Sequence, residues 1–273
     1  MKKVIITCAL TGSVPDKEKF PALPITVDEI VKDAIAVHEA GAAVVHVHVR
    51  DRVTGKNSHD IEQFREIQDR LHRECPDLIV QLSTGGRYDA SEDERDNALR
   101  CIPEMASWCP GSCAFPTGAY VNRVEYYTAQ AKFMLENHIK PEIEVFDTNM
   151  MCNAITLYKE GLLTGPLYFD FVMGVKNTQP ATLTHLGYLL SMLPEGAEWN
   201  LAGTAGMQIS TTLWALGAGG HVRVGLEDNQ YLYKGVKATN VQLVERAVRI
   251  AKEVGREVAT CDEARAMLGI RKR

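Results

Sequence analysis

The chain has 273 residues, with 30 lysines and arginines against 35 aspartates and glutamates, so its formal net charge is −5 when the histidines are neutral. This balance argues against a nucleic-acid-binding protein. Apolar residues make up 45% of the chain and charged residues 24%, a composition typical of an ordinary globular protein rather than a fibrous or disordered one.

The sequence contains no signal for a membrane or a secretory pathway. Its apolar runs fall short of the ~20 residues that a membrane helix needs. Residues 1–7 contain too few apolar residues for the apolar region of a secretory signal. The seven cysteines are scattered, as expected for reduced thiols. Cys109 and Cys113 lack a second pair to complete a zinc site, so we expect two loop or core thiols. We therefore expect a cytoplasmic protein with no membrane partner.

Short apolar strands alternate with amphipathic helices along the whole chain, without a change in composition, which predicts one domain over residues 1–273. The predicted strands span 4–9, 43–49, 78–82, 105–109, 143–146, 168–172, 199–201 and 221–224. The predicted helices span 26–40, 60–74, 92–100, 123–138, 149–160, 180–193, 208–218 and 238–255. The first helix begins with a capping-box pattern at Thr26 and Glu29 and is expected to end near Gly41.

Eight strands, each followed by a helix, predict an α/β fold and in particular a single (β/α)8 TIM barrel. The alternative is a doubly wound open sheet, which needs a glycine-rich turn after its first strand to bind a nucleotide. Residues 11–13 lack that glycine spacing, so the barrel is favoured. Because the active sites of barrels form at the carboxyl ends of the strands, the candidate residues are sought there.

The second strand carries two histidines two residues apart. The period of two places His46, His48 and Arg50 on one face of the strand and the valines on the other. Two imidazoles so placed can bind one metal ion. The spacing alone fits equally well two histidines that are satisfied by hydrogen bonds at a strand end.

The segment after the third strand combines hydroxyl groups with glycines. Ser83, Thr84 and Gly85 form part of a loop whose backbone amides can approach an anion, although the same residues also make ordinary turns. Residues 202–206, after the seventh strand, lie where many barrels bind phosphate, and they fit a tight turn equally well. The polar residues of the fourth and fifth strands are Ser107 and Glu144.

The eighth strand carries Arg223 and leads into two adjacent carboxylates, Glu227 and Asp228. In a closed barrel this strand neighbours the first, which neighbours the second, so one carboxylate can complete a two-histidine, one-carboxylate metal site with an open position. The spacing leaves either acid as the ligand. Arg223 can orient Asp228 as a base, or the two can form a surface salt bridge of little energetic value.

Several stretches, in order and at barrel spacing, resemble the β-keto acid cleavage enzyme family, whose best-known activity is 3-keto-5-aminohexanoate cleavage. The resemblance spans the whole chain. The matching stretches are residues 7–12, 24–26, 46–50, 81–86, 103–106, 141–144 and 220–229.

This resemblance implies that a β-keto acid and acetyl-CoA react to give acetoacetate and a new acyl-CoA, without a covalent enzyme intermediate. It implies Zn²⁺ or another divalent transition metal held by His46, His48 and Glu227. Asp228, oriented by Arg223, would remove the proton from the carbon between the carboxylate and the ketone. The enolate carbon would then attack the thioester, CoA would pass to the former ketone, and a retro-Claisen step would split the product.

The resemblance also implies residues that contact the substrate. Ser83 would form a hydrogen bond to it, and the expected substrate-binding residues are Ser107, Thr84, Gly85, Glu144 and Val14. The relatives that cleave aminohexanoate have a carboxylate at the position of Val14, so an amino substrate is not expected here. Residues 203–207 lack the arginine and aromatic residues of some relatives. Because relatives form homo-oligomers, we expect a dimer or tetramer.

Two other functions are open on the sequence alone. Lys176 follows the sixth strand, where its amine could form a Schiff base as in an aldolase, but this function leaves the paired histidines unexplained. The non-enzyme alternative is a metal-containing barrel that binds a small acid or CoA without turnover. The Arg223 and Asp228 pair argues against it, because a pure binder needs no positioned base.

Overall fold

The computed structural model describes residues 2–86, 90–116 and 118–272. Eight parallel strands form a closed barrel in the order β1-β12-β11-β10-β9-β6-β5-β2, and β1 also pairs with β2. The predicted (β/α)8 barrel is therefore confirmed. The barrel strands are β1 (Ile6–Ala9), β2 (Val44–Val47), β5 (Ile79–Leu82), β6 (Met105–Trp108), β9 (Lys140–Val145), β10 (Tyr168–Met173), β11 (Glu198–Gly203) and β12 (His221–Val224).

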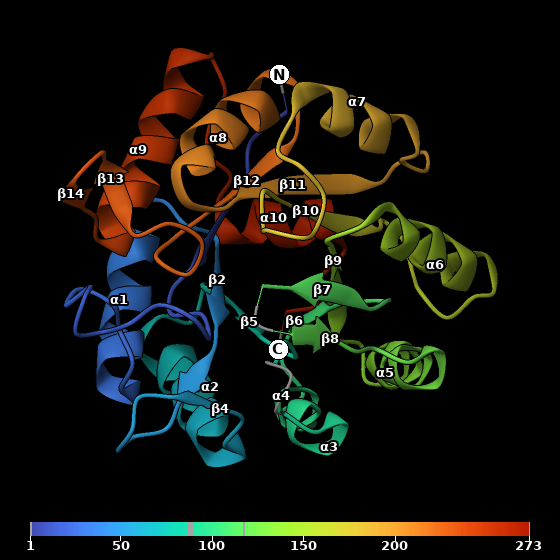
Figure 1. The fold of residues 1–273 in the computed structure, drawn as a ribbon, viewed down its shortest axis with the longest axis horizontal. Helices are drawn as coiled ribbons and strands as arrows, with labels where there is room; N and C mark the ends of the chain where they lie inside the picture. The colour runs from blue at the N-terminus through green and yellow to red at the C-terminus, as the bar shows by residue number, and fades with distance from the viewer. Residues whose placement is uncertain (1, 87–89, 117, 273) are drawn as a thin grey trace.

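The helices that connect these strands surround the barrel (Figure 1). The first of them begins at the predicted capping box, in which Thr26 and Glu29 each accept a hydrogen bond from the other's backbone amide. The helices are α1 (Val27–Glu39), α2 (Ile61–Glu74), α3 (Glu92–Arg95), α4 (Asn97–Arg100), α5 (Val124–Glu136), α6 (Thr148–Lys159), α7 (Leu183–Ser191), the 3-10 helix η1 (Ala205–Met207), α8 (Gln208–Gly217) and α9 (Asn240–Glu253). Within the described residues, no helix is long and apolar enough to cross a membrane.

Several short elements were not predicted. Three are antiparallel pairs, and the fourth, α10 (Cys261–Leu268), packs its buried face against inward-facing apolar residues at the amino-terminal end of the barrel. These barrel residues include Ile5, Val44 and Tyr168, so Val44 faces inward, unlike the valines that follow it. The three pairs are β3 (Val49–Arg50) with β4 (Asn57–Ser58), β7 (Cys113–Phe115) with β8 (Gly118–Tyr120), and β13 (Tyr231–Tyr233) with β14 (Val236–Lys237).

The middle of the barrel is polar, although branched apolar side chains usually fill this layer. Buried polar groups cost free energy unless they are paired, and some of these groups pair across the barrel: Asn200 donates a 2.9 Å hydrogen bond to Glu142. A polar layer of this kind directs attention to the strand ends just above it. Its members are Thr7, His46, Gln81, Ser107, Glu142, Asp170, Asn200 and Arg223, and all are buried.

Candidate active site

The two histidines of the second strand lie next to each other where this strand ends. β2 stops at Val47, and His48 stands at a break before β3 turns away to pair with β4, so the strand predicted over 43–49 is interrupted. The rings of His46 and His48 remain close, with their centroids 5.1 Å apart. Arg50, expected on the same face, instead donates hydrogen bonds to backbone carbonyls of the loop after β1.

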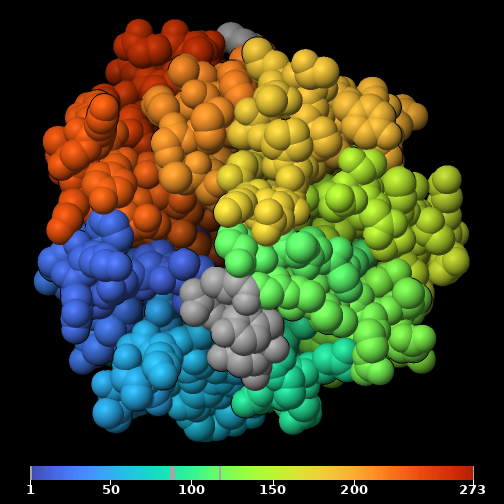
Figure 2. All heavy atoms as spheres, in the orientation of Figure 1, coloured from blue at the N-terminus to red at the C-terminus, as the bar shows by residue number. Residues whose placement is uncertain are grey.

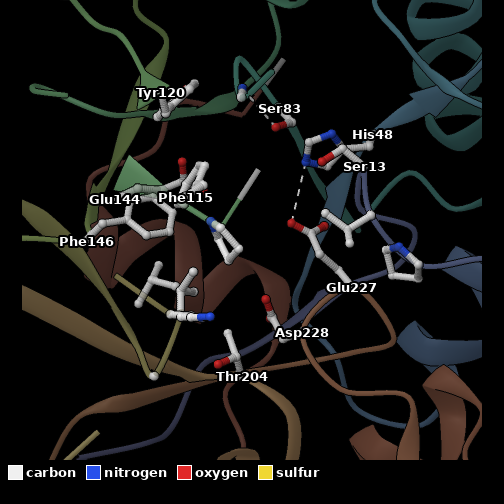
Figure 3. Close-up of a pocket in the computed structure, with 18 of the residues that line it drawn as sticks. Ser13, His48, Ser83, Phe115, Tyr120, Glu144, Phe146, Thr204, Glu227 and Asp228 are labelled. Carbon is white, nitrogen blue, oxygen red and sulfur yellow. Dashed lines mark hydrogen bonds and ion pairs between the residues drawn. The ribbon is translucent and has the colours of Figure 1, made fainter. Parts of the chain in front are cut away.

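Glu227 reaches both histidines from the loop after β12, and Figure 3 shows its contact with His48. Its Oε2 lies 3.6 Å from Nε2 of His46, and its Oε1 lies 3.5 Å from Nε2 of His48. Nε2 of His46 and Oε2 of Glu227 are buried and have no hydrogen-bond partner among the described residues. Two imidazole nitrogens and a carboxylate oxygen, all within 4.8 Å of one another, form a donor set that fits a divalent transition metal. Of the two acids that the sequence left open, Glu227 is the one at the histidines.

Gln81 determines which nitrogen of His46 is free. Oε1 of Gln81 accepts a hydrogen bond from Nδ1 of His46, so Nε2 carries the lone pair that faces Glu227. Burial lowers the pKa of His46 to about 3, which keeps the ring neutral, as a metal ligand must be. Burial also raises the pKa of Glu227, but His48, His46 and Arg223 outweigh this effect and hold that pKa well below its ordinary value.

Two glycines allow the turn that carries Glu227 to approach the first strand. Gly225 has a φ of +140°, and a Cβ atom there would lie 2.1 Å from the carbonyl oxygen of Ala9. Gly12 has a φ of +63°, and a Cβ atom there would lie 2.5 Å from Cγ of Glu227. The backbone amide of Glu227 donates a 3.2 Å hydrogen bond to Ala9. Only glycine fits these positions without moving the carboxylate.

Arg223 lies at the centre of a cluster of carboxylates. Its buried guanidinium donates a 3.0 Å hydrogen bond from Nε to Oδ2 of Asp228, which fixes the direction of that carboxylate. One guanidinium cannot balance five ionised acids, so some of them must bind protons. The closest nitrogen–oxygen distances are 2.9 Å to Glu227, 3.0 Å to Asp228, 3.1 Å to Asp170, 3.4 Å to Glu144 and 3.9 Å to Glu142.

The protons of this cluster belong mainly to the acids on β9 and β10. Burial raises the pKa of Glu142 and of Asp170 to about 8 and that of Glu144 to about 7, with Arg223 opposing each shift. Burial also raises the pKa of Asp228 above its ordinary value, again against Arg223. A carboxylate that is held in position and has a raised pKa is a better general base than an exposed one.

A cavity of about 450 Å³ at the carboxyl ends of the strands is bordered by His48, Glu144, Arg223, Glu227 and Asp228. The β7–β8 hairpin and the loop after β10 both line it, and in Figure 2 they lie side by side in green and yellow near the centre of the face. Figure 3 shows Ser83, His48 and Glu227 on one side of the cavity and Phe115 and Phe146 on the opposite side. The cavity therefore has one polar side and one aromatic side.

Ser83, Gly85, Glu144 and Val14, all predicted from the sequence, line this cavity. The hydroxyl oxygen of Ser83 accepts a 3.1 Å hydrogen bond from the amide of Gly85, which leaves the Ser83 proton free to be donated. Val14 lies on the loop after β1 and is 69% exposed. These four residues are placed where a substrate can reach them.

Thr84 and Ser107 are not among the described residues that line the cavity, and their expected contact with substrate stays a prediction. Oγ1 of Thr84 donates a 2.8 Å hydrogen bond to the carbonyl of Ser107, and the amide of Thr84 donates to the Ser107 hydroxyl at 3.3 Å. Both residues are buried. They join the loop after β5 to β6 and so support the backbone at Ser83.

Lys176 lines the cavity but is exposed on the loop after β10. It lacks the apolar surroundings that activate the amine of a Schiff-base lysine. The thiols of Cys109 and Cys113 are free, and Sγ of Cys109 contacts the sulfur of Met150 at 3.5 Å. Neither feature adds a reactive group to the site.

No role was predicted from the sequence for Gln81, Glu142 or Asp170. The period of two along the strands is the signal that identifies them. Gln81 lies two residues before Ser83, Glu142 lies two residues before Glu144, and Asp170 is an acid inside an apolar strand. Positions of this kind point into the barrel, beneath the residues of the site.

The fold and the cavity define a (β/α)8-barrel protein with a candidate metal site at the carboxyl ends of its strands. The family model for beta-keto acid cleavage enzyme matches residues 3–270, and the chain belongs to this family. The resemblance found in the sequence is thereby confirmed.

The similar proteins include two enzymes and one solved structure. The chain is 42% identical, over 274 residues and 100% of both chains, to the 3-keto-5-aminohexanoate cleavage enzyme of Fusobacterium nucleatum. It is 40% identical over 270 residues to the 3-oxoadipate:acetyl-CoA acetyltransferase of Cupriavidus necator, covering 97% of this chain and 94% of that one. The apo structure of ObcA superposes with a TM-score of 0.77 at 24% identity, covering 92% of this chain and 66% of ObcA, and this likeness supports the fold.

Proposed function

We propose that this protein converts a β-keto acid and acetyl-CoA into acetoacetate and a new acyl-CoA. The observation that carries the proposal is the convergence of His46, His48 and Glu227 next to Asp228, a base oriented by Arg223, in one cavity. The names of the two relatives given above support it, since both include a β-keto acid and one includes acetyl-CoA.

His46, His48 and Glu227 would hold zinc or another divalent transition metal. When bound, such an ion polarises the ketone and carboxylate oxygens of the substrate and lowers the cost of forming its enolate. Gln81 keeps Nε2 of His46 directed at the site through its hydrogen bond to Nδ1. Three protein ligands leave the remaining coordination positions to the substrate.

Asp228 is the base that removes the proton from the carbon between the carboxylate and the ketone. Arg223 orients it through the 3.0 Å hydrogen bond to Oδ2. Ser83 donates its free proton to a substrate oxygen and so helps to hold the reacting geometry. Gly85 and Glu144 also contact the substrate. Gly85 follows Ser83 closely in the chain, Glu144 lies beside Phe115 and Phe146 (Figure 3), and Val14 borders the same cavity.

The remaining steps take place between the two substrates. The enolate carbon attacks the acetyl thioester, and CoA leaves as a thiolate. The thiolate attacks the former ketone carbon. The bond from this carbon to the carbon that carries the carboxylate and the new acetyl group then breaks, and the electron pair remains on the latter carbon. Asp228 returns the proton there, which yields acetoacetate and the new acyl-CoA. No bond to a protein atom forms at any stage.

The test is an assay of the purified protein with acetyl-CoA and a simple β-keto acid such as 3-oxohexanoate, with acetoacetate and butanoyl-CoA as the measured products. Dialysis against a chelator should abolish the activity, and added zinc should restore it. Full activity in metal-free protein would overturn the proposed metal. Borohydride reduction in the presence of the β-keto acid should leave the protein mass unchanged, whereas an adduct on Lys176 would support an aldolase. Binding of both ligands without product would support a non-catalytic barrel.

We also propose a cytoplasmic location and a homo-oligomer, either a dimer or a tetramer. All seven cysteines are free thiols, which supports a reducing compartment. Tyr233 and Val236 on the β13–β14 hairpin are exposed, and a second copy of the chain could cover them. Light scattering on the purified protein tests the oligomer, and a monomer at micromolar concentration would contradict it.

A further inference from the structure

The side of the cavity opposite the histidines is an aromatic wall, formed by Phe115, Tyr120 and Phe146. The rings of Phe115 and Tyr120 are stacked, with centroids 5.4 Å apart and planes 20° apart. The ring of Phe146 meets that of Phe115 edge to face, with centroids 5.1 Å apart. Val172 and Val175 line the same cavity and add aliphatic surface. This wall is an apolar surface that a hydrocarbon chain can cover.

The aromatic wall is held in place by a buried arginine. The guanidinium of Arg95 lies 4.6 Å from the ring centroid of Tyr120, and its Nη2 donates a 2.6 Å hydrogen bond to the hydroxyl of that residue. Nη2 also donates to Oδ1 of Asn122, and Nε donates to the carbonyl of Thr84. The wall is therefore joined to the segment that carries Ser83. A surface fixed in this way loses little conformational entropy when a ligand packs on it.

The carboxylates that border the cavity all contact one guanidinium. Glu144, Glu227 and Asp228 are the carboxylates among its described lining residues, and each lies within 3.4 Å of a nitrogen of Arg223. A ligand that carries an ammonium group would have to compete with Arg223 for these carboxylates. Lys176 is the described lining cation outside this cluster, and it is exposed to solvent, where an ion pair adds little free energy.

A β-keto acid has two parts that must fit this cavity. Its carboxylate and ketone belong at His48, Glu227 and Ser83, which lie together on the polar side (Figure 3). The chain beyond the ketone then extends away from these residues. The cavity of about 450 Å³ belongs to the size class that encloses drug-sized molecules, so it has room for this chain.

We propose that the aromatic wall binds the chain beyond the ketone, and that the protein selects β-keto acids whose chain is an uncharged hydrocarbon. This proposal rests on the proposed function and specifies its substrate class. An ammonium or a second carboxylate would lose its water on entering beside these rings, a cost that a hydrocarbon chain does not have. The selectivity therefore comes from the cost of desolvating a charge, as well as from the contact with the rings.

The test uses three six-carbon β-keto acids, 3-oxohexanoate, 5-amino-3-oxohexanoate and 3-oxoadipate. Beyond the ketone, the first has no charged group, the second has an ammonium group and the third has a second carboxylate. We expect kcat/KM for 3-oxohexanoate to exceed that for each charged acid by about tenfold or more. Phe146→Ala should lower kcat/KM for 3-oxohexanoate about tenfold and leave the KM for acetyl-CoA unchanged. Phe146→Leu should retain most of the kcat/KM for 3-oxohexanoate. Tyr188→Ala changes an exposed aromatic residue on α7 that is not among the described residues lining the cavity, and it should leave these kinetic constants unchanged.

A preference for either charged acid would overturn the proposal. The proposal would also be overturned if Phe146→Ala raised the KM for acetyl-CoA to the same extent with each of the three acids, because the wall would then bind CoA. Calorimetric titration of the three acids without acetyl-CoA separates this proposal from the proposed function. If no products form but 3-oxohexanoate binds most tightly, the proposed reaction is rejected and the selectivity is kept. If a charged acid binds most tightly, the selectivity is rejected.

Discussion

Nε2 of His46 lies 3.6 Å from Oε2 of Glu227, and neither buried atom has a hydrogen-bond partner among the described residues. A buried polar atom without a partner costs about 1–3 kcal/mol. A divalent cation held by these residues would remove this cost and would stabilise the folded chain. The metal site is therefore the part of the proposal that can be tested without any substrate.

His46→Ala removes one of the three side chains proposed to bind the metal, and we expect it to lower the zinc affinity at least tenfold. Zinc content after dialysis and competition with a coloured chelator measure this change. His185→Gln alters a half-buried histidine on α7, away from the site, and should leave zinc binding unchanged. Equal zinc affinities in the two variants would contradict the site.

Gln81→Leu tests the hydrogen bond behind His46. Without the acceptor at Nδ1, the ring is free to change its tautomer and orientation, so we expect the metal affinity to fall by about 10–100-fold. Gln130→Leu is a matched control, because Gln130 is also buried but donates to Asp96 on the outer layer. If the two variants bind zinc equally well, Gln81 has no supporting role.

Asp228→Asn keeps an oxygen that can accept the hydrogen bond from Arg223 but removes the basic carboxylate. We expect kcat to fall by about 10²–10⁴-fold while zinc content and thermal stability change little. Steady-state assays with 3-oxohexanoate and acetyl-CoA measure the effect. Activity within tenfold of the unmodified protein would assign the base to another residue.

Gly225→Ala places a methyl group where the Ala9 carbonyl already lies, and it forces an alanine into a left-handed region of backbone space. We expect a loss of more than about 2 kcal/mol in the free energy of unfolding, together with weaker zinc binding, because the turn carries Glu227. Gly206→Ala has open space around it and should stay within about 1 kcal/mol. Chemical denaturation compares the two variants, and equal losses would rule out the steric explanation.

Asp33→Asn tests an acid on α1 that is partly buried. Burial raises the pKa of Asp33 from 3.8 to about 6, against the opposing hydrogen bond from Asn240 and the charge of Lys17. Because the folded state binds this proton more tightly than the unfolded state, ionised Asp33 lowers stability above pH 6, and this cost disappears as the pH falls towards 4.

We therefore expect Asp33→Asn to stabilise the protein by roughly 1–3 kcal/mol at pH 7.5 and to have no effect near pH 4. Denaturant unfolding at the two pH values measures the difference. Glu39→Gln changes an exposed acid on the same helix and should alter stability by less than about 0.5 kcal/mol at either pH. A gain in Asp33→Asn that does not depend on pH would show that its charge is not the cause.

The barrel strands were predictable because each is a short apolar run bounded by turn residues, and such runs carry a clear period. The three antiparallel pairs and α10 were missed. β3 and β4 have two residues each, which is too few for a periodic signal, and α10 shows its role only where its apolar face meets Ile5 and Tyr168. The family resemblance implies that Thr84 and Ser107 contact substrate. The structure shows a hydrogen bond between them, and their contact with substrate stays a prediction.

The sequence alone determined the order and type of the main elements and the strand ends that carry the histidines and acids, because the local spacing of apolar and polar residues encodes these features. The tertiary structure decided that Glu227 rather than Asp228 lies against the histidines and that Gln81 supports His46. It also decided that Arg223 gathers acids from β9, β10 and the loop after β12. These contacts join residues far apart in the chain. Their distances depend on strand register and on barrel closure, which no local pattern specifies.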